Sequence, residues 1–232
     1  MKELILNAPG KNALSTDLMR SVLDDLKRAG GAPLLVTGAG DAFSAGLNLK
    51  EVLSLTASTA PTFLALLEDM VEALYCYEGP MVALVNGHAI AGGCVVALCA
   101  DHRVMKSGTR ARIGLNETAI GLPFPPRVLA LAEARLPRQQ RERILLGGEL
   151  YDAESALTLG LVDEVAEDAS SVAGERLAAL ATRPPQAYAV NKLALRKGRL
   201  AANGGAKALF DRVGLPLWYS DSVKDIIRGL LS

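Results

Sequence analysis

One uncharged stretch limits the possible folds of this chain more than any other segment. Residues Met81–Ala100 contain no Asp, Glu, Lys or Arg, and a helix of that length is long enough to cross a lipid bilayer. Asn86, Gly87 and the pair Gly92-Gly93 interrupt the stretch with residues that favour turns. The pattern therefore predicts a buried strand, a turn and an apolar helix in a protein core, and it argues against a membrane span.

Apolar runs of strand length alternate with amphipathic helical patterns through the first two-thirds of the sequence, which predicts an α/β fold. The predicted strands cover residues 4–6, 34–36, 81–85, 103–105 and 162–165. The predicted helices cover residues 16–28, 61–77, 93–100, 126–146, 153–159, 171–181, 186–201 and 205–231, the last with a break near Pro216. The pair Pro184-Pro185 is the best internal boundary, separating a core of residues 1–183 from a helical region of residues 184–232.

Composition argues against several classes of function. Lys plus Arg and Asp plus Glu both number 25, so the chain has no overall positive charge to attract nucleic acid. Two His and three Cys, without a CxxC pair, predict neither a metal site nor a disulfide framework. The N-terminus has no signal-peptide cleavage pattern. We therefore expect a cytoplasmic protein that binds no nucleic acid, membrane or metal.

Two glycine-rich segments are candidates for binding a ligand through the backbone. The loop at residues 38–46 has no GxGxxG spacing, so a plain connector is its simplest interpretation. At Gly92-Gly93 a helix begins, and free N–H groups at a helix start carry positive partial charge. Together with an N–H from residues 45–47 they would form an oxyanion hole. Tight helix–sheet packing would also require small residues here.

Glu117 is the only charged residue in the apolar run Ile113–Phe124. A carboxyl group in apolar surroundings has a raised pKa, which suits a general base or acid near neutral pH. The alternative is an exposed glutamate on a loop or one that caps a helix. The two histidines, His88 and His102, have no recognisable nucleophile motif beside them and are predicted to be structural.

Four blocks of sequence, taken together, resemble the crotonase superfamily, which is the enoyl-CoA hydratase/isomerase family. The blocks are Asn7-Ala8-Pro9 with Asn12-Ala13-Leu14-Ser15, Phe43-Ser44-Ala45-Gly46-Leu47-Asn48-Leu49, Asn86-Gly87 through Ala91-Gly92-Gly93-Cys94, and Gly114-Leu115-Asn116-Glu117. They follow the order and spacing of the family and cover almost the whole chain. The chain is most similar to the Δ3,Δ2-enoyl-CoA isomerase branch.

The resemblance implies a spiral of ββα turns with C-terminal helices that form a homotrimer or hexamer. It implies an acyl-CoA substrate and no separate cofactor, since coenzyme A is part of the substrate. The backbone N–H groups of Leu47 and Gly92 would form the oxyanion hole. The substrate-binding residues would be Ala45, Gly46, Asn48, Leu49 and Asn116.

One departure from the family pattern points to the reaction. Hydratases of the family carry two glutamates; here Val95 replaces the first, and Glu117 matches the second. A single carboxylate can move a proton from C2 to C4 of an enoyl-CoA, so the resemblance favours an isomerase that shifts a double bond from C3 to C2. The alternatives are a hydratase, another acyl-CoA enzyme such as a lyase or thioesterase, and a non-catalytic acyl-CoA-binding protein. The proline-rich residues 122–126 would line and reshape the acyl pocket.

Overall fold

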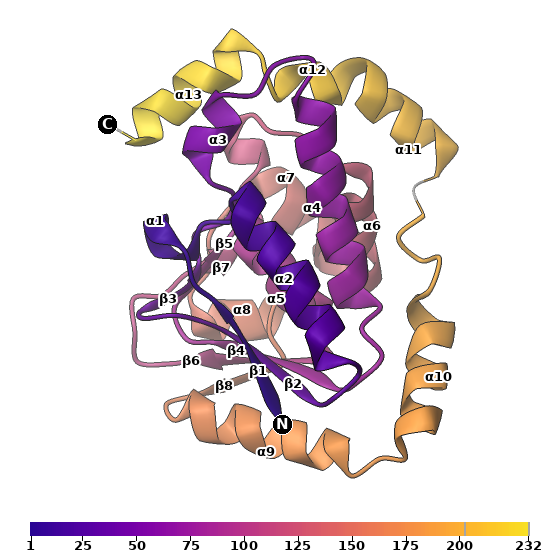
Figure 1. The fold of residues 1–232 in the computed structure, drawn as a ribbon. Helices are drawn as coiled ribbons and strands as arrows, with labels where there is room; N and C mark the ends of the chain where they lie inside the picture. Colours follow the sequence, from indigo (N-terminus) through magenta and orange to yellow (C-terminus); the bar gives the residue numbers. More distant parts are fainter. Residues whose placement is uncertain (202, 232) are drawn as a thin grey trace.

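The computed structural model describes residues 1–201 and 203–231, and its centre is a pair of parallel β-sheets (Figure 1). The larger sheet has the strand order β1-β2-β4-β6-β8, and the smaller sheet has the order β3-β5-β7. The strands of the larger sheet are β1 (Lys2–Leu6), β2 (Leu34–Gly38), β4 (Met81–Val85), β6 (His102–Lys106) and β8 (Glu164–Ala166). Those of the smaller sheet are β3 (Ala42–Ser44), β5 (His88–Ile90) and β7 (Ile113–Gly114).

From β2 onward, successive strands alternate between the two sheets, so the chain advances in ββα turns. The pairs β2–β3 and β4–β5 each place one strand in each sheet and are followed by helices, and β6–β7 repeats the arrangement. This is the α/β spiral that the resemblance implies. Its helices are α1 (Pro9–Asn12), α2 (Thr16–Ala29), α3 (Leu49–Leu53), α4 (Ala60–Tyr75), α5 (Gly92–Cys99), α6 (Pro126–Arg135), α7 (Arg141–Gly147), α8 (Ala153–Leu159) and α9 (Ala169–Ala181).

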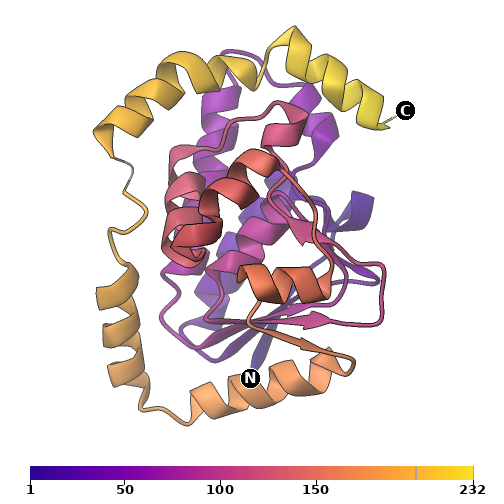
Figure 2. The same ribbon diagram turned by 180° about the vertical axis from the view of Figure 1, so that it is seen from behind.

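Both faces of the three central strands of the larger sheet, β2, β4 and β6, are buried, because the side chains of each strand alternate between two apolar clusters. Leu35, Val82 and Val104 pack against α9, which lies along one face of the sheet (Figure 2). Their neighbours Leu34 and Met81 point to the opposite face, into the main core with the inner helices. Because both faces of these strands are covered, β2 and β4 contain consecutive apolar residues instead of an alternation of apolar and polar ones.

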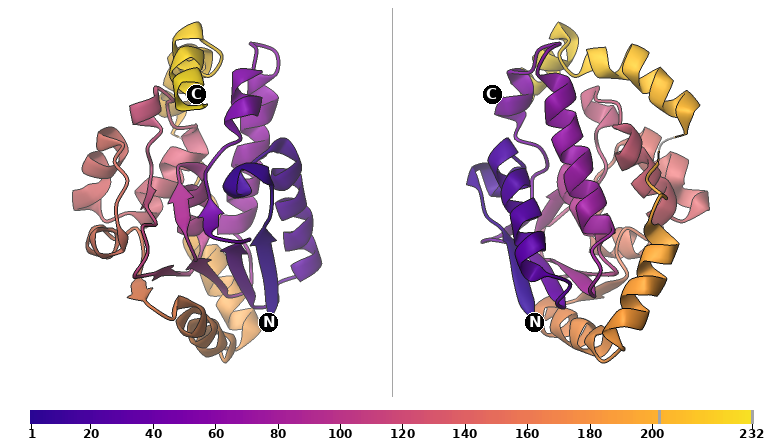
Figure 3. Two further views of the ribbon diagram at one scale, coloured as in Figure 1. Left: turned by 90° about the vertical axis from the view of Figure 1, so that its left-hand side faces the viewer. Right: turned by 45° about the vertical axis from the view of Figure 1, so that its right-hand side comes forward.

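The C-terminal helices form an arc around the outside of the spiral (Figures 1 and 3). They are α10 (Pro185–Arg196), α11 (Gly204–Leu209), a π-helical turn (Phe210–Gly214), α12 (Leu215–Leu217) and α13 (Asp221–Leu231). Lys192 and Arg196 of α10 reach the buried carboxylate of Asp101, each with an N–O distance of 2.8 Å. These two ion pairs tie the arc to the end of α5.

The structure differs from the sequence prediction where proline and glycine interrupt helices. The helix predicted at residues 126–146 is broken, because Leu136 is extended and Pro137 has no N–H to continue the helix. The helix predicted at 186–201 ends at Arg196, before Gly198 with a φ of 78°. Pro216 lies inside α12 instead of at the break, because proline is compatible with the first turn of a helix.

The three strands of the smaller sheet are too short to be predicted from the sequence alone. The segment 38–46, interpreted as a plain connector, contains β3. In the part of the chain that is described, no helix combines the length and the apolar character that a bilayer crossing requires.

Candidate active site

The segment after β3 presents the N–H of Leu47 to the interior. Leu14 and Leu47 form an isolated parallel bridge in which the Leu14 N–H donates to the Gly46 carbonyl and the Asn48 N–H donates to the Leu14 carbonyl. The two distances are 2.7 and 3.1 Å. Because backbone groups alternate in direction along an extended chain, the N–H of Leu47 points away from Leu14.

The start of α5 lies directly against this segment. A Cβ placed on Gly92 would lie 3.5 Å from the Leu47 nitrogen, so the two backbones are in contact. Gly46 has a φ of 87°, and a Cβ there would lie 2.7 Å from the Ile90 carbonyl oxygen, so only glycine fits. In the described residues, neither the Leu47 N–H nor the Gly92 N–H donates to a protein oxygen. Two free backbone N–H donors, of Leu47 and Gly92, therefore lie close together.

Ala91, the residue before α5, holds a strained backbone conformation with a φ of 48° and a ψ of −115°. Its N–H donates to the carbonyl of Gly114 over 2.8 Å. Strain of this kind persists only where the surroundings impose it, and it is concentrated at functional sites. Here it lies between β5 and the first residue of α5, which is in contact with the Leu47 backbone.

Buried polar side chains hold the loop that carries Leu47. Asn12, with a φ of 59°, donates from Nδ2 to the carbonyls of Ala39 and Ala42 over 2.9 and 2.8 Å. The hydroxyl of Ser44 donates to the carbonyl of Asn12 over 2.8 Å. Asn86 binds both the N–H and the carbonyl of Gly38, which fixes the neighbouring turn. In the sequence these residues stand out only as parts of motifs, and their polar character alone does not predict that they hold the loop.

Glu117 lies in the apolar surroundings that its sequence context predicts. The residue is 6% exposed, and its Oε2 has no hydrogen-bond partner among the described residues. Burial disfavours the charged form and raises the pKa of Glu117 to about 8. Its backbone carbonyl accepts hydrogen bonds from Ile120 and Leu122, which fold the following loop tightly around it. The alternative of an exposed loop glutamate is wrong.

These groups share one small cavity of about 100 Å³. The residues singled out from the sequence that lie on its wall are Ala45, Leu47, Leu49, Gly92, Val95, Asn116 and Glu117, together with Leu122 and Pro125 of the proline-rich segment 122–126. Glu117 is the only ionisable side chain on this wall, within the described part of the chain. The Oδ1 of Asn116 is also buried without a partner, so it too is available to a ligand.

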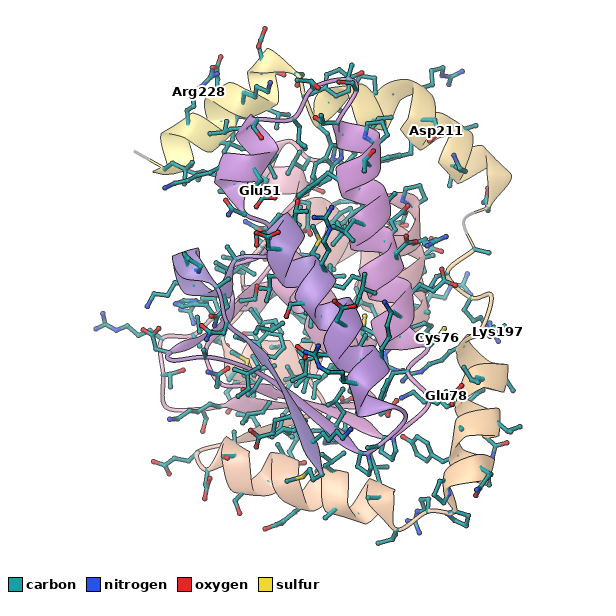
Figure 4. All side chains as sticks on the ribbon, viewed as in Figure 1. Glu51, Cys76, Glu78, Lys197, Asp211 and Arg228 are labelled. Atoms are coloured by element: carbon teal, nitrogen blue, oxygen red, sulfur yellow. The ribbon has the colours of Figure 1, made fainter. Side chains whose placement is uncertain are left out.

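Two of the predicted substrate-binding residues, Gly46 and Asn48, are not on the cavity wall. Gly46 supports the wall through its contact with Ile90 and Gly92. Asn48 caps α3, since its Oδ1 accepts from the N–H groups of Lys50 and Glu51 over 3.0 and 3.4 Å. The carboxylate of Glu51 in turn accepts from the N–H and hydroxyl of Thr16 at the start of α2 (Figure 4).

The contribution of the C-terminal arc to the cavity was not predicted from the sequence. Trp218 and Leu230 complete the wall although they lie more than 100 residues after Glu117 in the chain, and no local pattern marks them. His88 and His102 lie elsewhere: His88 accepts from the Arg112 N–H, and His102 pairs with Glu164. In the described residues, no three His, Cys, Asp or Glu side chains are grouped so as to hold a metal ion.

Comparison with known proteins assigns the chain to a family. The family model described as enoyl-CoA hydratase/isomerase matches residues 2–208, which is most of the chain. The chain belongs to the enoyl-CoA hydratase/isomerase family. It is therefore an enzyme of the crotonase superfamily, which includes hydratases and isomerases of enoyl-CoA thioesters.

Some proteins similar to this chain are named hydratases, and others are named isomerases. A probable enoyl-CoA hydratase of Mycobacterium tuberculosis is 31% identical over 196 residues, which is 82% of this chain and 74% of the relative. A crotonyl-CoA hydratase of Syntrophomonas wolfei is 30% identical over 225 residues, covering 90% and 80% of the two chains. The human mitochondrial Δ3,Δ2-enoyl-CoA isomerase structure has a TM-score of 0.87 and 25% identity, over 99% of this chain and 92% of its own.

Proposed function

We propose that this enzyme is a Δ3,Δ2-enoyl-CoA isomerase with Glu117 as its single proton-transfer group. The observation that carries the proposal is that one carboxyl group, and no second ionisable side chain from the described residues, faces the cavity. The opposite position on α5 is Val95, which is apolar and 2% exposed. A 1,3-proton shift needs one group that accepts and then returns a proton, and Glu117 supplies it.

The reaction proceeds in two proton transfers. The Glu117 carboxylate takes a proton from C2 of the 3-enoyl-CoA, and the electron pair of that C–H bond moves into the thioester. A dienolate forms, with its negative charge on the thioester oxygen. The Glu117 carboxylic acid then gives the same proton to C4, and the electrons return to leave a C2–C3 double bond. Atoms and charge balance without a cofactor, because coenzyme A is part of the substrate.

The N–H groups of Leu47 and Gly92 would stabilise the dienolate oxygen. They are adjacent, free of protein acceptors in the described residues and fixed before substrate binds. Gly92 also stands at the positive end of α5. Donors fixed in this way stabilise developing charge without the cost of reorganisation, and one such donor is worth about 10²–10³-fold in kcat.

Hydration is the second candidate, and the names of the relatives favour it. Addition of water needs a water molecule that is both deprotonated and oriented. Glu117 can do the first, but Val95 offers no hydrogen bond for the second. On this argument the isomerase reaction is better matched to the cavity.

Product analysis tests the proposal. Purified enzyme is mixed with a 3-enoyl-CoA, and the ultraviolet absorbance of the conjugated 2-enoyl thioester is followed. We expect the reaction to stop at the 2-enoyl product and to slow by about 10²–10⁴-fold in Glu117→Gln. The exposed Glu133→Gln serves as the matched control. Conversion to a 3-hydroxyacyl product would instead identify a hydratase.

We also propose that the C-terminal region mediates assembly into a homotrimer or hexamer. Leu146, Leu209 and Val213 are large apolar side chains with at least half of their surface exposed, and they lie in one groove. Exposed apolar patches of this kind mark interaction surfaces. Light scattering after size-exclusion chromatography measures the mass, and a monomer at micromolar concentration would contradict this proposal.

A further inference from the structure

Trp218 forms part of the cavity wall that carries Glu117. It follows α12 in the C-terminal arc, yet its side chain is 1% exposed and is among the largest fully buried side chains of the protein. It is the only tryptophan in the sequence. A bulky ring in this place removes volume that an acyl chain would otherwise occupy.

The indole is held by the same loop that carries the proposed base. Its Nε1 donates to the carbonyl oxygen of Pro123 over 3.2 Å. The preceding residue, Leu122, donates its N–H to the carbonyl of Glu117 over 2.9 Å. The loop 117–123 therefore links Glu117 at one end to the Trp218 ring at the other, which fixes the ring relative to Glu117.

A second, larger hollow shares part of this loop with the cavity. It is an apolar groove of about 860 Å³, lined in part by Leu122, Pro123 and Leu217. Leu122 faces both spaces, and Trp218 lines the cavity while its neighbour Leu217 lines the groove. The Leu122 side chain thus separates the cavity from the groove, and the Trp218 ring, which lines the cavity alone, completes this partition on the cavity side.

We propose that Trp218 sets the acyl-chain length of the substrate and restricts the enzyme to short chains of roughly four to six carbons. The cavity of about 100 Å³ is well below the 300–1,000 Å³ typical of ligand pockets. A cavity of this size has room for only a few carbon atoms beside Glu117. This inference rests on the proposed function, because it assumes that the acyl chain enters the cavity beside Glu117.

Binding of saturated acyl-CoAs tests the proposal without requiring turnover. Calorimetric dissociation constants are measured for butyryl-, hexanoyl-, octanoyl- and dodecanoyl-CoA with the wild-type enzyme, Trp218→Ala and Leu122→Ala. Leu217→Ala, on the groove side only, is the matched control. We expect the wild type to bind hexanoyl-CoA at least about tenfold more tightly than dodecanoyl-CoA. Both partition variants should remove or reverse that preference, and the control should keep it.

Equal wild-type affinity for the two chain lengths would overturn the proposal, as would an unchanged preference in the folded partition variants. If Trp218→Ala does not fold, the chain-length preference of Leu122→Ala tests the proposal. Failure of the isomerase proposal gives a different pattern. In that case the binding preference and its loss in the variants remain, while 3-enoyl-CoA substrates are not isomerised.

Discussion

The guanidinium of Arg196 donates a hydrogen bond of 3.0 Å to the carbonyl oxygen of Cys99, the last residue of α5. Arg135 donates to the carbonyls of Leu98 and Ala100 at the same helix end. Cations at a helix C-terminus match the sign of its dipole and satisfy carbonyls that have no partner within the helix. The helix that presents Gly92 to the cavity at one end is thus held at the other end by the C-terminal arc.

Replacing Arg196 by Met should destabilise the protein by roughly 3–5 kcal/mol. The change leaves the buried Asp101 with one cation fewer and removes donors from two backbone carbonyls, and breaking a buried ion pair has a cost of this size. Chemical denaturation measures the loss in the free energy of unfolding. Arg199→Met, at an exposed position nearby, is the control and should change stability by less than about 0.5 kcal/mol. Equal losses in the two variants would contradict a specific role for Arg196.

The rate of isomerisation should rise with pH up to about 8. Burial raises the pKa of Glu117 to about 8, so most of the free enzyme carries a protonated, inactive carboxyl group at pH 6. Below the pKa, kcat/KM should fall about tenfold for each pH unit, because it follows the ionised fraction of the free enzyme. Initial rates with a 3-enoyl-CoA between pH 6 and 9.5 give the profile. A flat profile from pH 6 to 8 would contradict a rate-controlling carboxyl group with a pKa near 8.

Glu117→Gln should make the folded protein more stable at neutral pH. The folded-state pKa of about 8 lies above the ordinary value of 4.5, so between these values the folded state binds the proton more tightly than the unfolded state does. Stability is therefore lost as pH rises from about 4.5 to 8. Removing the titrating group should recover up to about 3 kcal/mol at pH 7 and nothing at pH 4. Denaturant midpoints of the variant and wild type at both pH values measure the difference, and a loss of stability at pH 7 would refute the expectation.

The sequence predicted the parts of this fold that depend on apolar periodicity. The strands at β2 and β4 and the helix α2 were found because their patterns are local. The short strand β5 was missed, because three residues show no period and its pairing partners are distant in sequence. For the site, Glu117 stood out as one charge in an apolar run. Trp218 did not, because tertiary packing alone brings it to the cavity.

Two substitutions of Gly92 separate its N–H from its lack of a side chain. Proline at this first helical position of α5 removes the N–H, whereas alanine keeps it and adds a Cβ about 3.0 Å from Leu14 Cδ1. Both variants must accommodate extra atoms in the same place, so the ratio of their rates reports the N–H. We expect Gly92→Pro to be about 10²–10³-fold slower in kcat than Gly92→Ala, the effect of one lost oxyanion donor. Circular dichroism confirms that both variants are folded, and single-turnover rates with a 3-enoyl-CoA measure the chemical step. Equal rates in two folded variants would mean that the Gly92 N–H does not stabilise the dienolate, and the stabilisation would then have to come from Leu47 and other groups on the cavity wall.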